Sequence, residues 1–170
     1  MATASPFSIK VHDLMHRPGA MRENEIDITL DETMGDGAMT IAAGSVIELD
    51  LRLESVHEGI LATGEVFTKA VGECSRCLDA LNTPVEVDFQ ELFAYSGTEE
   101  DDFKVSDEQI DLESVIRDAI VLSLPFQPVC SPDCPGLCPD CGVKLAENPN
   151  HAHDQQVDSR WTELLKFKEE

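Results

Sequence analysis

Four cysteines lie close together near the C-terminal end of the chain, in the stretch CSPDCPGLCPDCG (130–142). The last two, Cys138 and Cys141, are separated by two residues and followed by Gly142. Thiolates at this spacing can both reach one zinc ion at about 2.3 Å. A proline inside the turn and a glycine after it allow the tight backbone that such a geometry requires. The CPDCG stretch therefore predicts a zinc knuckle.

A zinc knuckle supplies two ligands, whereas a structural zinc site has four. His151 and His153 follow the knuckle across a loop rich in proline and asparagine, with a loop length that is ordinary for such sites. We therefore expect Cys138, Cys141, His151 and His153 to form one site with two cysteine and two histidine ligands. The alternative is that both histidines are solvent-exposed loop residues without a ligand role.

The remaining cysteines form two pairs, Cys74/Cys77 and Cys130/Cys134. The first pair lies at the end of a predicted strand, and the second follows the helix that is expected to pack on the same sheet. If these two ends meet, the four thiolates form a zinc site that joins the sheet to the tail. The residues alone leave two alternatives open. One is that these cysteines bind no metal. The other is a local four-thiolate site, made by Cys130, Cys134, Cys138 and Cys141, that leaves the first pair free.

The CSRC stretch (74–77) also permits redox chemistry. Arg76 lies between the two thiols, and its charge is of the sign that lowers a thiol pKa. A thioredoxin-like site would need the C-x2-C to open a helix, but here the sequence returns to a strand within ten residues. A thiol-based sensor or redox chaperone using Cys74 and Cys77 is therefore the alternative function. No motif positions a nucleophile or base, so we expect a protein that is not an enzyme.

Alternation of apolar and polar residues predicts the strands that must position these ligands. SVIELDLRLESV (45–56) is the clearest strand, and residues 59–73 read as its hairpin partner. VEVDFQELF (85–93) alternates again, as do residues 7–11 and 25–30. Four or five antiparallel strands with one solvated face are the expected arrangement.

Residues 110–125 (IDLESVIRDAIVLSLP) have the periodicity of an amphipathic helix that packs on the sheet. Asp111 is its expected N-cap and Pro125 its expected end. A short terminal helix is predicted over 158–170. The expected fold is α+β: an antiparallel sheet or partly open barrel packed by one amphipathic helix, followed by a C-terminal zinc-knuckle tail and the short terminal helix.

The charge balance limits the partners. The chain has 34 acidic and 12 basic side chains and a formal net charge of -22, which disfavours contact with phosphates or anionic membranes and favours basic partners. No apolar run approaches the roughly 18 residues of a membrane span, and no secretory signal opens the chain, so we expect a cytoplasmic protein. In a reducing cytosol, clustered cysteines favour metal over disulfides. The length of 170 residues is enough for one compact domain with a small appendage. We expect a core domain over 1–126 and a Cys/His-rich zinc-binding tail over 127–170.

Several stretches, taken together and in order, resemble the YceD family of bacterial and plastid proteins, with actinobacterial members most similar. They are CSRCLDAL, VEVDFQELF, IDLESVIRDAIVLSLPFQPVC, CPGLCPDCGVKL and DSRWTEL, and with their spacing the likeness covers roughly residues 45–166. The C-x-R-C-L stretch and the G-L-C-P-x-C-G knuckle are specific when they occur together. The matching positions are Cys74, Arg76, Cys77, Leu78, Glu91, Asp111, Leu112, Pro125, Cys130, Cys134, Gly136, Leu137, Cys138, Cys141 and Gly142.

The resemblance implies a role in large ribosomal subunit biogenesis, because members are linked to accumulation of 23S rRNA and not to a defined catalytic reaction. Their genes commonly neighbour that of a small basic ribosomal protein. We therefore expect a non-enzymatic factor, stabilised by one or two structural zinc ions, that binds a basic ribosomal protein or a pre-50S particle and neither membrane nor DNA. Contact with rRNA is expected to be indirect or confined to a basic patch made by Lys144, Arg160, Lys166 and Lys168.

The resemblance also bears on the ligand sets. Many relatives have C-x-C where this chain has His151 and His153, and a zinc position tolerates exchange of thiolate for imidazole. Some relatives carry histidine where Cys130 and Cys134 stand, even when they lack the knuckle. This favours pairing of these two cysteines with the CSRC stretch (74–77). Ser159 stands where the family usually has proline, a change that should leave the function intact.

Overall fold

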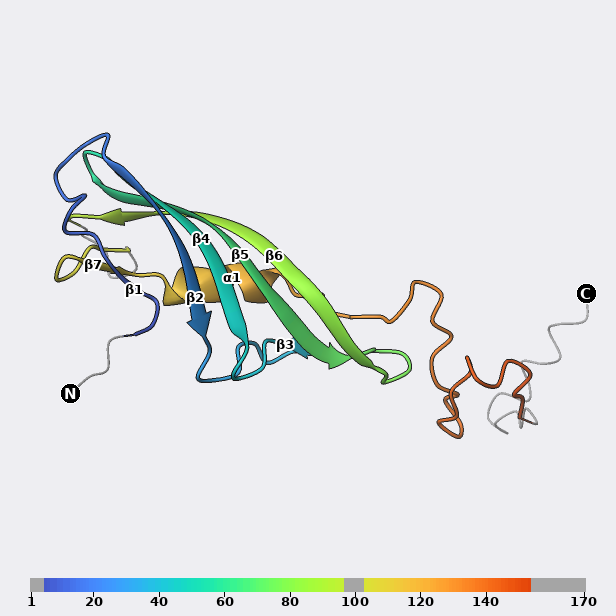
Figure 1. Cartoon of the computed structure of the whole chain (residues 1–170). Coiled ribbons are helices and arrows are strands. Elements are labelled where there is room, and N and C mark those ends of the chain that lie inside the picture. The colour runs from blue at the N-terminus through green and yellow to red at the C-terminus, as the bar shows by residue number, and fades with distance from the viewer. Residues whose placement is uncertain (1–4, 97–102, 154–170) are drawn as a thin grey trace, which may run out of the picture.

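A curved antiparallel sheet lies over a single helix, and the cysteine-rich tail extends beyond one end of the sheet (Figure 1). The computed structural model describes residues 5–96 and 103–153. In the main sheet β2 pairs with β4, and β5 pairs with β4, β3 and β6. Its strands are β2 (Met21–Thr29), β3 (Met39–Thr40), β4 (Val46–Ser55), β5 (Gly59–Glu73) and β6 (Ala80–Ala94).

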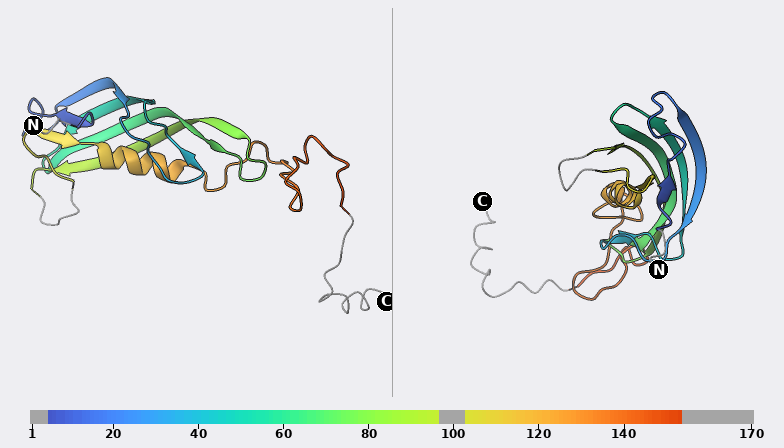
Figure 2. Two further views of the ribbon diagram at one scale, coloured as in Figure 1. Left: turned by 90° about the horizontal axis from the view of Figure 1, so that it is seen from below. Right: turned by 90° about the vertical axis from the view of Figure 1, so that its left-hand side faces the viewer.

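A second, two-stranded sheet and the helix complete the fold. The small sheet joins β1 (Ser8–Lys10) to β7 (Gln109–Asp111), which precedes α1 (Glu113–Ser123). The main sheet curves around α1, so that the core lies between its inner face and the helix (Figure 2). These observations confirm the expected class, an antiparallel sheet packed by one amphipathic helix. No helix in the described part of the chain is long and apolar enough to span a membrane.

The alternating pattern of β4 fixes which side of the sheet faces the helix. Ile47, Leu49 and Leu53 are each at most 1% exposed, whereas the charged residues between them face solvent. Because side chains alternate along a strand, a shift of register by one residue would turn those charges toward the core. The apolar stripe of α1, including Ile116 and Ile120, meets this inner face.

The start of the helix differs from the prediction in one respect. Asp111 belongs to β7, and Leu112 occupies the N-cap position. The carboxylate of Asp111 nevertheless accepts a hydrogen bond of 3.0 Å from the backbone N–H of Glu113. Asp111 therefore satisfies a helix N-terminal donor from one residue further out than expected. Pro125 follows the end of the helix, as predicted.

The strand β6 is longer than its alternating pattern indicates. It begins at Ala80, five residues before the predicted start, and includes Pro84 opposite Lys69 of β5. Proline is tolerated because β6 has a strand neighbour on one side only along this stretch, so that no central ladder loses a donor. The short strands β3 and β7 were not predicted, and the expected terminal helix over 158–170 lies outside the described residues.

Candidate metal centres

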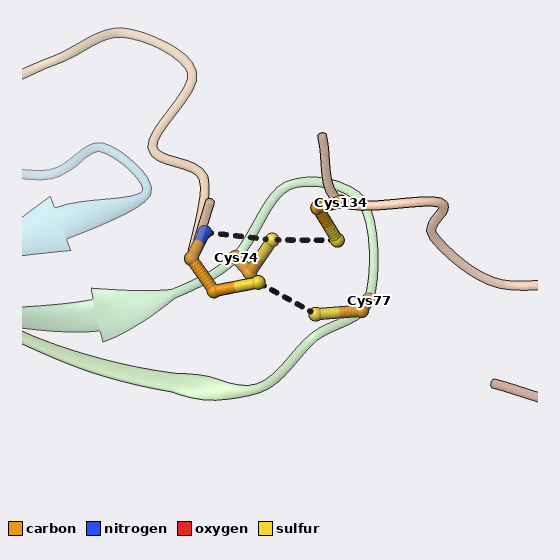
Figure 3. A group of neighbouring side chains, drawn as sticks. Cys74, Cys77 and Cys134 are labelled. Carbon is orange, nitrogen blue, oxygen red and sulfur yellow. Dashed lines mark hydrogen bonds between the residues drawn. The ribbon is translucent and has the colours of Figure 1, made fainter. Parts of the chain in front are cut away.

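Four cysteines meet where the end of β5 and the chain after α1 come together. Figure 3 shows the sulfurs of Cys74, Cys77 and Cys134 facing one another, and the sulfur of Cys130 completes the group, all within 4.8 Å of one another. Two of the sulfur–sulfur distances are 3.9 Å (Cys74 to Cys134) and 3.6 Å (Cys77 to Cys130). A tetrahedral zinc ion with bonds of about 2.3 Å separates its sulfur ligands by about 3.8 Å. The four thiols therefore fit a four-thiolate zinc site.

The backbone around Cys74 is arranged to favour its thiolate. Burial raises the pKa of this thiol, but backbone N–H groups, among them those of Arg76 and Cys130 at 3.4 Å, donate to the sulfur and together lower the pKa to about 6. For Cys77 the balance is opposite: the backbone N–H of Asp79 lowers the pKa, but burial and the neighbouring thiols and carboxylate raise it in net. A cation among the four sulfurs would relieve this competition by stabilising every thiolate.

Arg76 fastens the tail to the CSRC turn. Its guanidinium Nη1 donates to the carbonyl oxygens of Pro132 (3.1 Å) and Cys134 (3.0 Å). Its own carbonyl accepts a hydrogen bond of 3.0 Å from the N–H of Leu137. The sequence suggested Arg76 as a charge that acts on a thiol, whereas the structure shows its side chain holding the backbone on which Cys134 lies.

A second cluster lies further along the tail and contains Cys138, Cys141, His151 and His153. Their ligand atoms also lie within 4.8 Å of one another. The Cys141 sulfur is 3.1 Å and 3.2 Å from the Nε2 atoms of the two histidines, which are 2.8 Å apart. Two thiols and two imidazoles are a donor set typical of structural zinc. This cluster fits a second zinc ion.

The two knuckles share one backbone design. In each, the residue after the second cysteine has a positive φ and donates its N–H to the carbonyl of the first cysteine: Gly142 to Cys138 at 2.8 Å, and Leu78 to Cys74 at 2.9 Å. In the second knuckle the backbone N–H groups of Asp140 and Cys141 lower the pKa of Cys138 to about 6. Both turns therefore direct N–H groups at a sulfur, as a metal-binding thiolate requires.

The structure thus places each predicted ligand in one of two groups. Cys130 and Cys134 lie with the CSRC pair and not with the CPDCG knuckle, so the described residues do not form the local four-thiolate arrangement. An ion pair between Lys144 and Asp79 connects the tail to the CSRC turn. Lys144 therefore does not contribute an unpaired positive charge to a basic patch. Its ammonium group is paired with the carboxylate of Asp79 and lowers the pKa of that carboxylate.

Two features of the site escaped the sequence. Asp79 accepts a hydrogen bond of 3.3 Å from the Cys77 thiol and is paired with Lys144. Because it is one of 34 acidic residues, nothing in the sequence distinguishes it from the others. Leu78 adopts the left-handed backbone that glycine usually occupies, which its position after C-x2-C could have indicated. The other basic-patch candidates, Arg160, Lys166 and Lys168, lie outside the described residues.

Comparison with known proteins identifies relatives along most of the chain. The family model described as "Large ribosomal RNA subunit accumulation protein YceD" matches residues 62–168, which include both clusters. An uncharacterized protein of Mycobacterium tuberculosis is 48% identical over 171 residues, covering 96% of this chain and 82% of the relative. An uncharacterized protein of Mycobacterium leprae is 41% identical over 167 residues, covering 94% of this chain and 76% of the relative.

A shorter match reaches a named plant protein. The large ribosomal RNA subunit accumulation protein YCED homolog 1, chloroplastic, of Zea mays is 44% identical over 43 residues, covering 25% of this chain and 15% of that protein. The search of solved structures found no significant match.

Proposed function

We propose, since this chain belongs to the YceD family of large ribosomal RNA subunit accumulation proteins, that it is a non-enzymatic cytoplasmic factor in the biogenesis of the large ribosomal subunit. The family match over residues 62–168 is the observation that carries this proposal. The name of the maize relative connects the family to accumulation of the large-subunit rRNA. The role at the molecular level is to hold a ribosomal component during assembly and not to transform a substrate.

The metal assignment within this proposal is two structural zinc ions. One is held by Cys74, Cys77, Cys130 and Cys134. The other is held by Cys138, Cys141, His151 and His153. Bound zinc would supply a rigid tetrahedral link and no reaction, because a site closed by four protein ligands leaves no position for substrate or water. Support comes from the two convergent donor sets and from the backbone N–H groups directed at their sulfurs.

The partner within this proposal is a basic ribosomal protein or a pre-50S particle. A chain with a net charge of -22 repels the phosphates of naked rRNA and attracts a cationic protein. The ion pair of Lys144 with Asp79 further reduces the cationic surface available to nucleic acid. The effect on rRNA is therefore indirect, through the protein that the factor holds.

The test is depletion of the protein in its host cell, followed by measurement of the ratio of 23S to 16S rRNA and of sedimentation in a sucrose gradient. We expect the ratio to fall and the tagged protein to co-sediment with large-subunit precursors. Wild-type protein should restore the ratio, whereas a Cys74→Ser/Cys138→Ser double variant should restore it less. An unchanged ratio in the depleted cells would contradict the proposal.

The second candidate is a thiol-based sensor that uses Cys74 and Cys77. The lowered pKa of Cys74 favours it, because a thiolate is the reactive form. Its complete burial and the neighbouring sulfurs disfavour it, since an oxidant would have no access to Cys74 in the folded protein. Reversible oxidation of this pair in the native protein would support this alternative.

A further inference from the structure

The face of the sheet that is turned away from α1 carries acidic side chains that lie directly opposite one another. In one row across the sheet, Glu25 is paired with Asp50, Asp50 with Glu65, and Glu65 with Asp88. These four residues come from β2, β4, β5 and β6, and all four are exposed. One continuous row of carboxylates therefore crosses the four long strands. The side of the sheet turned away from α1 is its convex side, as the ribbon in Figure 2 shows.

A second row lies two residues further along the same strands. Here Asp27 is paired with Glu48, Glu48 with Phe67, and Phe67 with Glu86. The two rows share a face because side chains two residues apart on a strand point the same way. None of the ion pairs seen between described residues includes a carboxylate of either row.

This arrangement works against the stability of the sheet. Like charges directly opposite on neighbouring strands are destabilising, and neither row contains a cation that would offset the repulsion. The inner faces of the same strands already supply the apolar contacts that hold the sheet on α1. Folding therefore does not explain the two rows, whereas a cationic partner laid across them would remove the repulsion.

The same face has two shallow hollows that lie along it. The first, of about 640 Å³, lies over the first row and is lined by Glu25, Asp50 and Glu65. Its lining also includes Arg52, whose guanidinium is paired with Glu54. The second, of about 420 Å³, adjoins the second row, and its lining includes the apolar side chains of Val46 and Phe67 together with Lys69 at its edge. Carboxylates beside apolar surface suit a polypeptide with both cationic and aliphatic side chains better than they suit a polyanion.

We propose that this outer face, defined by the two rows, is a docking surface for a Lys/Arg-rich polypeptide segment with apolar side chains between its basic residues. The inference rests on the proposed function and names the surface by which the protein holds its basic partner. The segment lies across the strands, its cations between the paired carboxylates and its apolar side chains over Val46 and Phe67.

The test neutralises the first row and measures binding of a defined probe. The probe is a synthetic peptide in which Lys and Arg alternate with Leu and Val, titrated by fluorescence anisotropy at physiological salt. We expect the row variant to bind at least about tenfold more weakly than wild type. It should melt at a higher temperature, because the repulsion is gone, and this excludes misfolding as the cause. The variant carries Glu25→Gln, Asp50→Asn, Glu65→Gln and Asp88→Asn.

A matched control removes the same number of charges from exposed loops. It should bind the peptide within about threefold of wild type, because only screened long-range attraction is lost. Equal weakening in both variants, or unchanged binding in the row variant, would overturn the proposal. The proposal would also be overturned if the wild-type protein bound a 23S rRNA fragment and the row variant did not, because the face would then bind RNA. The control carries Asp31→Asn, Glu32→Gln, Asp36→Asn and Glu58→Gln.

This experiment is separable from the test of the proposed function. If the row variant binds the peptide like wild type while depletion still lowers 23S rRNA, the docking surface is wrong and the proposed function stands. If the wild-type face binds the peptide specifically but depletion leaves the rRNA ratio unchanged, the reverse holds.

Discussion

Among single residues, Leu78 has a backbone conformation that residues other than glycine rarely adopt. Its φ is +61°, and its side chain is 59% exposed, so little packing holds it there. The equivalent position of the second knuckle is Gly142, which adopts the same conformation without steric cost. The CSRC turn requires this backbone because the N–H of Leu78 must reach the carbonyl of Cys74.

The strain at Leu78 predicts that Leu78→Gly stabilises the protein. Left-handed backbone costs a residue with a Cβ about 1–2 kcal/mol, and glycine does not carry this cost. The greater freedom of glycine in the unfolded chain offsets about 0.5–1 kcal/mol of that gain. We expect the free energy of unfolding of the metal-loaded protein to rise by about 0.5–1 kcal/mol in chemical denaturation.

The control for Leu78 is the same substitution at an exposed leucine with helical backbone. Leu122 in α1 is 85% exposed, and Leu122→Gly should lower the free energy of unfolding by about 1 kcal/mol. Opposite signs for the two substitutions would show that backbone conformation decides the effect. A loss of stability in Leu78→Gly would contradict the account.

At the scale of elements, the contact between the CSRC turn and the tail depends on Arg76. We expect Arg76→Leu to release zinc to a chromogenic chelator at least about tenfold faster than wild type, because groups that orient the ligands of a metal sustain its affinity. Amide hydrogen exchange at Leu137, whose N–H is bonded to the carbonyl of Arg76, should also accelerate.

Arg117 provides the control, since it is exposed on α1 and pairs only with Glu113 of the same helix in the described structure. Arg117→Leu should leave zinc release within about twofold of wild type, because one exposed ion pair of a helix contributes little. Wild-type release rates in Arg76→Leu would show that Arg76 does not position the first cluster.

The sequence anticipated those elements and ligands whose signal is local. The alternation in 45–56 identified β4, and the spacing of Cys138, Cys141 and the two histidines identified the second group, because in both cases neighbouring residues carry the information. The short strand β3 and the early start of β6 arise from pairing with β5. Their own residues do not indicate this pairing, and Pro84 in β6 even argues against a strand.

The first cluster shows the same limit over a longer distance. Cys74 and Cys134 are sixty residues apart in the chain, and the fold brings their sulfurs to 3.9 Å. Residue spacing alone left two arrangements open, because a cysteine pair does not state its partner. The return of the chain from α1 to the end of β5 decides between them, as the hydrogen bond from Ser75 N–H to the Pro128 carbonyl illustrates.

At the scale of the whole molecule, the protein combines a strongly acidic surface with two cysteine-based centres at one end. The core between sheet and helix contains no cysteine, so its packing does not depend on metal. The tail meets the CSRC turn in a small apolar cluster made by Cys74, Cys77 and Cys134, which is too little to hold a chain segment alone. We therefore expect the structure of the tail to depend on bound zinc.

The metal content of the intact protein decides whether the two clusters hold zinc. It is measured by elemental mass spectrometry on protein purified without chelator, with a titration of free thiols on the same sample. We expect about two zinc ions per chain and no freely reactive thiol before denaturation. One zinc with two reactive thiols would remove the first cluster and strengthen the redox alternative for Cys74 and Cys77. Absence of zinc, with disulfides in its place, would contradict the account.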